Sequence, residues 1–167
     1  MKFSPADQTQ MSHALASLGL QPGGFLLQTG SAQTRKNREG TLRVLAALKD
    51  RWPGQVVFAG EAMTPGQMEL AESLQISDRV VQLTDVSDEL LTMLYTGAHA
   101  MLFPSLCEGF GWPVLEAQAC GCPVITADNT SLPEVAGDGA MIFNAADHEG
   151  MAQAVLMLDD VVRREEL

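Results

Sequence analysis

Long apolar segments are missing from this sequence of 167 residues. The uncharged apolar run at 98–103 is far too short to span a bilayer, which takes about 20 residues as a helix. The first ten residues also lack the basic start and the apolar run of a secretory signal. We therefore expect a chain without a membrane span that works in the cytoplasm.

Basic residues are scarce. Lys and Arg total 10 against 21 Asp and Glu, and the formal net charge is −11. A domain this acidic is repelled by nucleic-acid backbones and by anionic membrane surfaces, so we expect neither as a partner. Three of the cations, Arg35, Lys36 and Arg38, fall within four positions, a run that by itself indicates a solvated loop.

Cysteines and histidines, three of each, show no metal-ligand spacing. Cys120-Gly121-Cys122 is tighter than the usual CxxC pair of a zinc site. Free thiols packed as small hydrophobes are the better interpretation. The sequence therefore predicts no metal centre.

Apolar runs of strand length alternate with segments of helical periodicity along the chain. The predicted strands cover 25–29, 55–59, 79–83, 99–103, 123–126 and 140–143, and the predicted helices cover 10–18, 41–49, 65–74, 87–95, 114–119 and 148–158. Strands that alternate with helices need right-handed crossovers, which give a mainly parallel sheet covered on both faces. We predict a Rossmann-like, doubly wound α/β domain over 24–167, preceded by a leading segment at 1–23. Ligands of such sheets bind beyond the carboxyl ends of the strands.

The segment 104–117, after the fourth predicted strand, is the most informative part of the sequence. Pro113 fits the first position of a helix, because it lacks the N–H that would have no partner there. The N–H groups of Val114 and Leu115 would then lie free at the positive end of the helix dipole. Such a helix end binds phosphate without a basic side chain, so an acidic domain could hold a pyrophosphate in this way.

Two carboxylates flank this predicted helix start. Glu116, in the first turn, can accept hydrogen bonds from two adjacent hydroxyls, which suits a ribose 2′,3′-diol. Glu108 precedes the helix, so the two side chains would bracket a ligand that lies across the helix end. Gly109 and Gly111 lack a Cβ and let backbone amides approach a sugar ring. Each feature alone is explained by surface charge or turn chemistry, but their combination after a buried strand favours a ligand site.

From 108 to 124 the sequence is EGFGWPVLEAQACGCPV. This pattern resembles the E-x7-E signature of the retaining GT-B glycosyltransferases of the "group 1" family (glycosyltransferase family 4). Further matches lie at 30–37, 58–60, 86–95 and 132–135, and the resemblance covers about 25–158. It implies that the chain is the C-terminal, donor-binding half of a GT-B fold, without the N-terminal domain that binds the acceptor.

The resemblance also implies roles for single residues. Glu116 would bind the ribose of a nucleotide diphosphate sugar, and Glu108 would position the donor sugar. Lys36 matches the lysine that stabilises the departing diphosphate. The arginine that usually accompanies it, directly after the glycine, is Ser31 here, and Arg35 would take its place. The other implied contacts with the donor come from Gly30, Gly109, Phe110, Gly111, Val114 and Leu115, and the nucleobase would rest against the loop from Leu83 to Val86.

The function implied is that of a hexosyltransferase of polysaccharide biosynthesis, which needs no cofactor beyond its nucleotide-sugar donor. Its acceptor would be a glycan or a lipid-linked sugar, and the full-length enzyme would work at the inner face of the membrane. The Arg-Lys-Asn run is similar to that of bacterial polysaccharide enzymes, many of them mannosyltransferases, so GDP-mannose is the first donor to test. The isolated domain would bind donor and transfer nothing.

Three alternatives stay open. A nucleotide-sugar epimerase has the same architecture but a different loop in place of E-x7-E. A dinucleotide-binding domain would carry G-x-G-x-x-G after its first strand, and no such motif is present there. A non-catalytic nucleotide-binding or regulatory module could retain the fold without the reaction.

Overall fold

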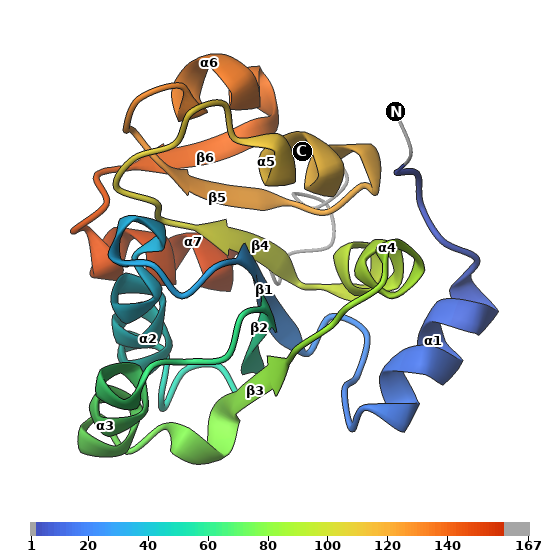
Figure 1. Cartoon of the computed structure of the whole chain (residues 1–167), viewed down its shortest axis with the longest axis horizontal. Coiled ribbons are helices and arrows are strands. Elements are labelled where there is room, and N and C mark those ends of the chain that lie inside the picture. Colours follow the sequence, from blue (N-terminus) through green and yellow to red (C-terminus); the bar gives the residue numbers. More distant parts are fainter. Residues whose placement is uncertain (1–2, 159–167) are drawn as a thin grey trace.

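One parallel sheet of six strands organises the chain, in the order β3-β2-β1-β4-β5-β6 (Figure 1). The structure is a computed structural model that describes residues 3–158. The predicted doubly wound fold is confirmed, and each strand lies within one residue of its predicted bounds. The strands are β1 (Phe25–Gly30), β2 (Gln55–Gly60), β3 (Val80–Leu83), β4 (Ala100–Phe103), β5 (Val124–Ala127) and β6 (Ala140–Phe143).

Helices cover both faces of this sheet (Figure 1). One face carries α2 (Arg38–Ala47), α3 (Pro65–Ser73) and α7 (His148–Met157), and the other carries α1 (Gln8–Ser17), α4 (Asp88–Gly97), α5 (Trp112–Ala119) and α6 (Leu132–Ala136). Short 3₁₀ turns lie at η1 (Thr34–Lys36), η2 (Ser77–Arg79) and η3 (Gly137–Gly139). Successive strand residues point to opposite faces, so Leu26 and Leu27 belong to two separate hydrophobic cores.

Side chains at the helix starts explain where several helices begin. Ser87 accepts a hydrogen bond from the Leu90 N–H and caps α4, as its place before an apolar periodic segment predicts. Thr64 and Gln67 form a capping box at the start of α3. The five-residue helix α6 lies outside the predicted helices.

The leading segment contributes to the core. Its helix α1 buries Met11 and Leu15 against α4. Gly97 at the end of α4 permits this approach, because a Cβ there would overlap the Leu15 side chain. Among residues 3–158, no helix has the length and apolar character needed to cross a membrane.

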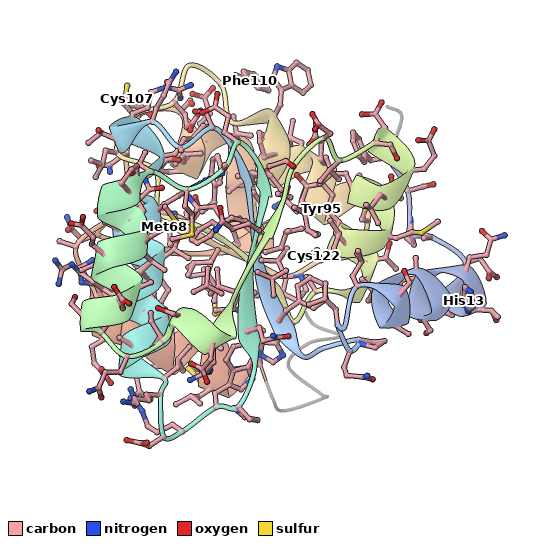
Figure 2. All side chains as sticks on the ribbon, turned by 60° about the horizontal axis from the view of Figure 1, so that its bottom comes forward. His13, Met68, Tyr95, Cys107, Phe110 and Cys122 are labelled. Atoms are coloured by element: carbon pink, nitrogen blue, oxygen red, sulfur yellow. The ribbon has the colours of Figure 1, made fainter. Side chains whose placement is uncertain are left out.

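The three cysteines are free thiols. Cys120 and Cys122 are buried, as predicted, whereas Cys107 is exposed and the prediction is wrong for this residue. Figure 2 shows Cys107 at the rim of the molecule and Cys122 in its interior. Cys107 belongs to the loop after β4, which also carries the candidate site.

The strand order reverses between β1 and β4. From β1 the chain passes to α2 on one face of the sheet, and from β4 it passes to α5 on the other face. Parallel sheets bind ligands in the crevice that opens beyond the carboxyl ends of two such strands. The loops after β1 and β4 are therefore where a site is expected.

Candidate functional site

The loop after β1 begins at Gly30, whose φ of 107° lies in the region that favours glycine. The Gly30 carbonyl accepts a hydrogen bond from the Arg38 guanidinium at 2.8 Å. The same guanidinium donates to the carbonyl of Glu61, directly after β2, at 2.9 Å. Arg38 is fully buried, so it fixes the carboxyl ends of two neighbouring strands and is not a solvated loop residue.

Lys36 closes turn η1 with its side chain turned inward. The Gln28 amide in β1 donates to the Lys36 carbonyl at 2.6 Å and fixes the backbone at this point. The Lys36 ammonium lies 4.7 Å from the centroid of the Phe103 ring at the end of β4, within the range of a cation–π interaction. The solvated-loop interpretation is therefore wrong for Lys36 as well as for Arg38.

Lys36 and Glu108 form an ion pair across the two loops. Nζ lies 2.7 Å from Oε1, and the two side chains are only 8% and 7% exposed. Arg35 Nη1 lies 3.4 Å from Oε2 of the same carboxylate, with 45% of the Arg35 side chain exposed. Two cations therefore face one carboxylate in a chain whose net charge is −11. Cations placed in this way favour a diphosphate through direct charge-assisted contacts.

The loop after β4 is held in place at several backbone groups. The Glu108 N–H donates to Thr130 Oγ1 at 3.1 Å, and Thr130 belongs to the loop between β5 and α6. The Leu106 N–H donates to the Arg35 carbonyl at 2.7 Å, which joins this loop directly to η1. Both cations and the carboxylate therefore sit on backbone segments that are hydrogen-bonded to each other or to a neighbouring loop.

The stretch from Gly109 to Gly111 reaches the surface. Within the described part of the chain, no atom lies within 4 Å of the place that a Cβ of Gly109 would occupy. Phe110 is 44% exposed, and its ring packs on Trp112, which is 60% exposed, with 4.7 Å between the ring centroids. Figure 2 shows Phe110 at the outer edge of the molecule. This edge has space for a ligand beside Gly109, whereas Gly111 is buried, and a Cβ there would lie 2.9 Å from Leu132.

Helix α5 begins one residue earlier than expected. Its first residue is Trp112, so Pro113 is its second, and its N-cap is Gly111, which has no side chain to cap the helix. The prediction of a free Val114 N–H is wrong, because this group donates to the Gly111 carbonyl at 3.0 Å. A phosphate contact of the Val114 or Leu115 amide stays a prediction, and at Val114 it would share or replace that bond.

The prediction that Glu116 lies in the first turn is wrong, because α5 begins at Trp112 and Glu116 is its fifth residue, in the second turn. Glu116 is joined to the end of β1 through Tyr95. The Tyr95 hydroxyl donates to Glu116 Oε2 at 3.0 Å. It also lies 3.3 Å from the Thr29 hydroxyl. A tyrosine has one hydroxyl proton to donate. Because Tyr95 donates it in the hydrogen bond to Glu116, Thr29 must be the donor in the bond with Tyr95. Tyr95 lies in the segment 86–95 that resembles the family, but sequence reasoning gave it no role, although the hydroxyl of a buried tyrosine needs a partner.

Burial raises the pKa of the Glu116 carboxyl above its ordinary value. The hydrogen bond from Tyr95 acts in the opposite direction, and the nearby Asp88 adds to the rise. Burial also holds the pKa of the Tyr95 hydroxyl far above its usual range, so this group stays protonated and remains a donor.

Both predicted carboxylates therefore connect to the carboxyl end of β1. Glu108 is paired with Lys36, which lies beside Gly30, and Glu116 is linked through Tyr95 to Thr29, the residue before Gly30. Among the described residues, these contacts join α4, α5 and the loops after β1 and β4 into one site at the point where the strand order reverses.

Leu83 and Val86, predicted beside the nucleobase, flank the carboxyl end of β3. Both side chains are partly buried and pack against the core beneath α4 and α5. β3 lies two strands away from β1 in the sheet. Their contact with a base stays a prediction.

No group of three His, Cys, Asp or Glu residues within 3–158 could hold a metal ion. Within that range, Arg35, Lys36 and Glu108 meet between the loops after β1 and β4, and Glu116 is linked to the end of β1 through Tyr95. Their chemistry suits an anion that also carries hydroxyl groups.

Comparison with protein families identifies the chain. The model of "Glycosyl transferases group 1" matches residues 17–160. The chain belongs to this family. Among its relatives, the O-antigen chain mannosyltransferase B of Escherichia coli is 33% identical over an alignment of 158 positions, which covers 92% of this chain and 42% of that protein. The chain thus spans about two fifths of the length of this relative.

Solved structures share the fold of this chain. The Anabaena protein HepE, in complex with UDP and glucose, superposes with a TM-score of 0.85 at 16% identity, over 96% of this chain and 45% of that one. The C-terminal domain of the group 1 family protein LpcC from Francisella tularensis gives a TM-score of 0.75 at 21% identity, over 97% of this chain and 88% of that one. At these identities the likeness shows the fold alone.

Proposed function

We propose that this chain is the donor-binding domain of a retaining glycosyltransferase that moves a hexose from a nucleotide diphosphate sugar to a glycan or lipid-linked acceptor. Membership of the group 1 family supports the reaction class. The mannosyltransferase relative supports mannose as the sugar, and the UDP and glucose held by HepE support a nucleotide-sugar donor.

The observation that carries this proposal is the ion pair of Lys36 and Glu108 with Arg35 beside it. Lys36 has three N–H donors, so it can hold Glu108 and a phosphate oxygen at the same time. Glu108 in turn keeps one oxygen within 3.4 Å of Arg35 and lies next to Gly109, where the surface is open. This arrangement places diphosphate binding and sugar binding side by side.

The chemical role of the site follows from where charge develops. Glycosyl transfer builds positive charge on the anomeric carbon and negative charge on the departing diphosphate. Lys36 and Arg35 stabilise the leaving group electrostatically, and such preorganised charge commonly contributes most of the rate acceleration of an enzyme. Glu108 positions the donor sugar and forms no covalent intermediate, and Glu116 binds the ribose.

A ligand screen tests the proposal. Thermal shift and calorimetry with UDP, GDP and ADP, and with their sugars, should show binding of one of these nucleotides, and GDP-mannose is the first candidate. Lys36→Ala should weaken binding at least about tenfold, the usual cost of losing a charged hydrogen bond. Lys49→Ala is the matched control, because Lys49 is exposed and its ammonium bonds only Gln75 among the described contacts. Binding of NAD would instead favour a dinucleotide domain, and no binding of any nucleotide a non-catalytic module.

We further propose that the acceptor site belongs to a second, N-terminal domain. The span of about two fifths of the Escherichia coli relative supports this, as does the separate C-terminal domain known from LpcC. The chain alone should then bind the donor weakly and transfer no sugar to polysaccharide or lipid-linked acceptors. Robust transfer by this polypeptide would contradict the two-domain arrangement and leave the donor site intact.

A further inference from the structure

We propose that Tyr95 is a positioning residue that, with Thr29, fixes the Glu116 carboxylate for the 2′-hydroxyl of a ribose and so makes the site select ribonucleotides over 2′-deoxyribonucleotides. This inference rests on the proposed function, because it needs a nucleotide in the site. It gives donor recognition two further residues, Tyr95 of α4 and Thr29 of β1, which lie outside the E-x7-E segment.

The geometry defines a chain of two hydrogen bonds in one direction. Thr29 donates to the Tyr95 hydroxyl over 3.3 Å, and Tyr95 donates to Glu116 Oε2 over 3.0 Å. Thr29 is 5% exposed and Tyr95 is fully buried, so the bond between them is shielded from water, whereas Glu116 at the outer end is partly exposed. The Tyr95 ring is itself held by the edge of Phe3, with 5.9 Å between the centroids. Figure 2 shows Tyr95 inside the molecule, on the inner side of its helix α4.

This chain of bonds leaves one carboxylate oxygen for the ligand. Oε2 of Glu116 is engaged by Tyr95, whereas Oε1 has no hydrogen bond among the contacts of the described residues. A mobile glutamate side chain loses rotamer entropy when a ligand fixes it. The bond from Tyr95 orders the Glu116 side chain when the protein folds. The binding of a ribose therefore does not have to include that entropy loss.

The link also explains the position of the only tyrosine in the chain. A phenylalanine would fill the same space in the core beneath α4. The hydroxyl adds nothing to this apolar packing, and it reaches only Thr29 and Glu116 among the described hydrogen bonds. The role of the hydroxyl is therefore to hold the Glu116 carboxylate in place.

The test compares ribonucleotides with their 2′-deoxy counterparts by calorimetry, using UDP with 2′-deoxy-UDP and GDP with 2′-deoxy-GDP. The wild-type chain should prefer the ribonucleotide by about tenfold or more, as expected for a hydrogen bond to a charged group. Tyr95→Phe should reduce this preference to about twofold or threefold, with less than a twofold change for the deoxynucleotide. Thr29→Val, which removes only the outer bond, should act in the same direction and more weakly.

A double mutant separates positioning from packing. If Tyr95 acts through Glu116, then Tyr95→Phe combined with Glu116→Gln should show the same ribose preference as Glu116→Gln alone. Thr96→Val is the matched control on α4, because it removes a hydroxyl that bonds the Ala6 N–H and does not touch Glu116. It should lower the melting temperature and leave the ribose preference unchanged.

The outcomes distinguish the two proposals. A wild-type ribose preference that Tyr95→Phe and Thr29→Val leave intact overturns the role of Tyr95 alone. An equal loss for both sugars in Tyr95→Phe also overturns it, because that is the result of a merely structural role. Nucleotide binding without any ribose preference overturns the Glu116 assignment and this inference, while the donor-binding proposal stands. Absence of all nucleotide binding overturns both.

Discussion

The Lys36 ammonium lies 2.7 Å from Glu108 Oε1, across the point where the strand order of the sheet reverses. Each side chain comes from a different loop, and neither is more than 8% exposed. A pair with so little contact with water depends on both partners. Removal of one leaves the other as an uncompensated charge, which costs more than the pair contributes.

Lys36→Met should therefore lower the free energy of unfolding by about 3 kcal/mol, at the lower end of the range for broken buried pairs, because Arg35 still faces Glu108. Urea denaturation measures this change. The double variant Lys36→Met/Glu108→Gln should recover at least half of the loss. Lys49→Met, at an exposed position, should change stability by less than about 0.5 kcal/mol. A Lys36→Met protein as stable as wild type would contradict the buried pair.

The two glycines of the loop after β4 should respond differently to alanine. Gly109 has φ outside the left-handed region and open space where a Cβ would be, so Gly109→Ala should keep wild-type stability. Gly111 has a φ of 98°, and its Cβ would lie 2.9 Å from Leu132 Cδ2, so Gly111→Ala should destabilise by about 1–3 kcal/mol.

Gly109→Ala should also change the binding of the donor. Gly109→Ala should weaken binding of the nucleotide sugar more than binding of the nucleotide alone, because the added methyl group enters the space proposed for the sugar. Calorimetry with GDP and GDP-mannose, or with UDP and UDP-glucose, measures the difference. If Gly109→Ala weakened the binding of both ligands equally, the sugar would not lie beside Gly109.

Glu116 should reduce stability at neutral pH in exchange for function. Burial raises its pKa in the folded state above the ordinary value of 4.5, so the folded chain holds this proton to a higher pH than the unfolded chain. The stabilisation from that proton is complete below about pH 4.5 and is lost as the pH rises through the folded-state pKa. The groups around the carboxyl are Tyr95, Asp88 and Cys120.

Glutamine does not ionise, so Glu116→Gln avoids the loss of stability that ionisation of Glu116 causes as the pH rises. The melting temperature of this variant relative to wild type should therefore increase between about pH 4 and about pH 7. Melting curves followed by circular dichroism across this range test the sign. Glu134→Gln, at an exposed position of α6, should show no such trend. No trend in Glu116→Gln would show that the carboxylate is well solvated, and a protein that becomes relatively less stable toward neutral pH would show that it is paired.

The strands could be predicted because apolar runs of this length, bounded by Gly and Pro, have few other solutions in a chain of alternating periodicity. The short helix α6 was missed because its five residues, Leu132–Ala136, are too few to show a helical period. Its start carries a proline and a glutamate in the first turn, a local signal that resembles an ordinary turn.

The candidate site could be predicted as a set of residues but not as a set of contacts. Lys36, Glu108 and Glu116 follow from the motif, yet the pairing of Lys36 with Glu108 and the bond from Tyr95 depend on how distant loops meet. The burial of Arg38 could not be predicted from the sequence, because a cation in a polar segment is usually solvated. Only the tertiary structure supplies the carbonyls of Gly30 and Glu61 that satisfy it.

Titration of the chain with nucleoside mono- and diphosphates tests most directly whether Lys36 holds the diphosphate. Wild-type protein should bind UDP or GDP at least about tenfold more tightly than the matching monophosphate, since the second phosphate adds charged hydrogen bonds. Lys36→Ala should abolish this gain, and Lys49→Ala should retain it. Equal affinity of wild-type protein for mono- and diphosphates, or a full diphosphate gain in Lys36→Ala, would contradict the donor site.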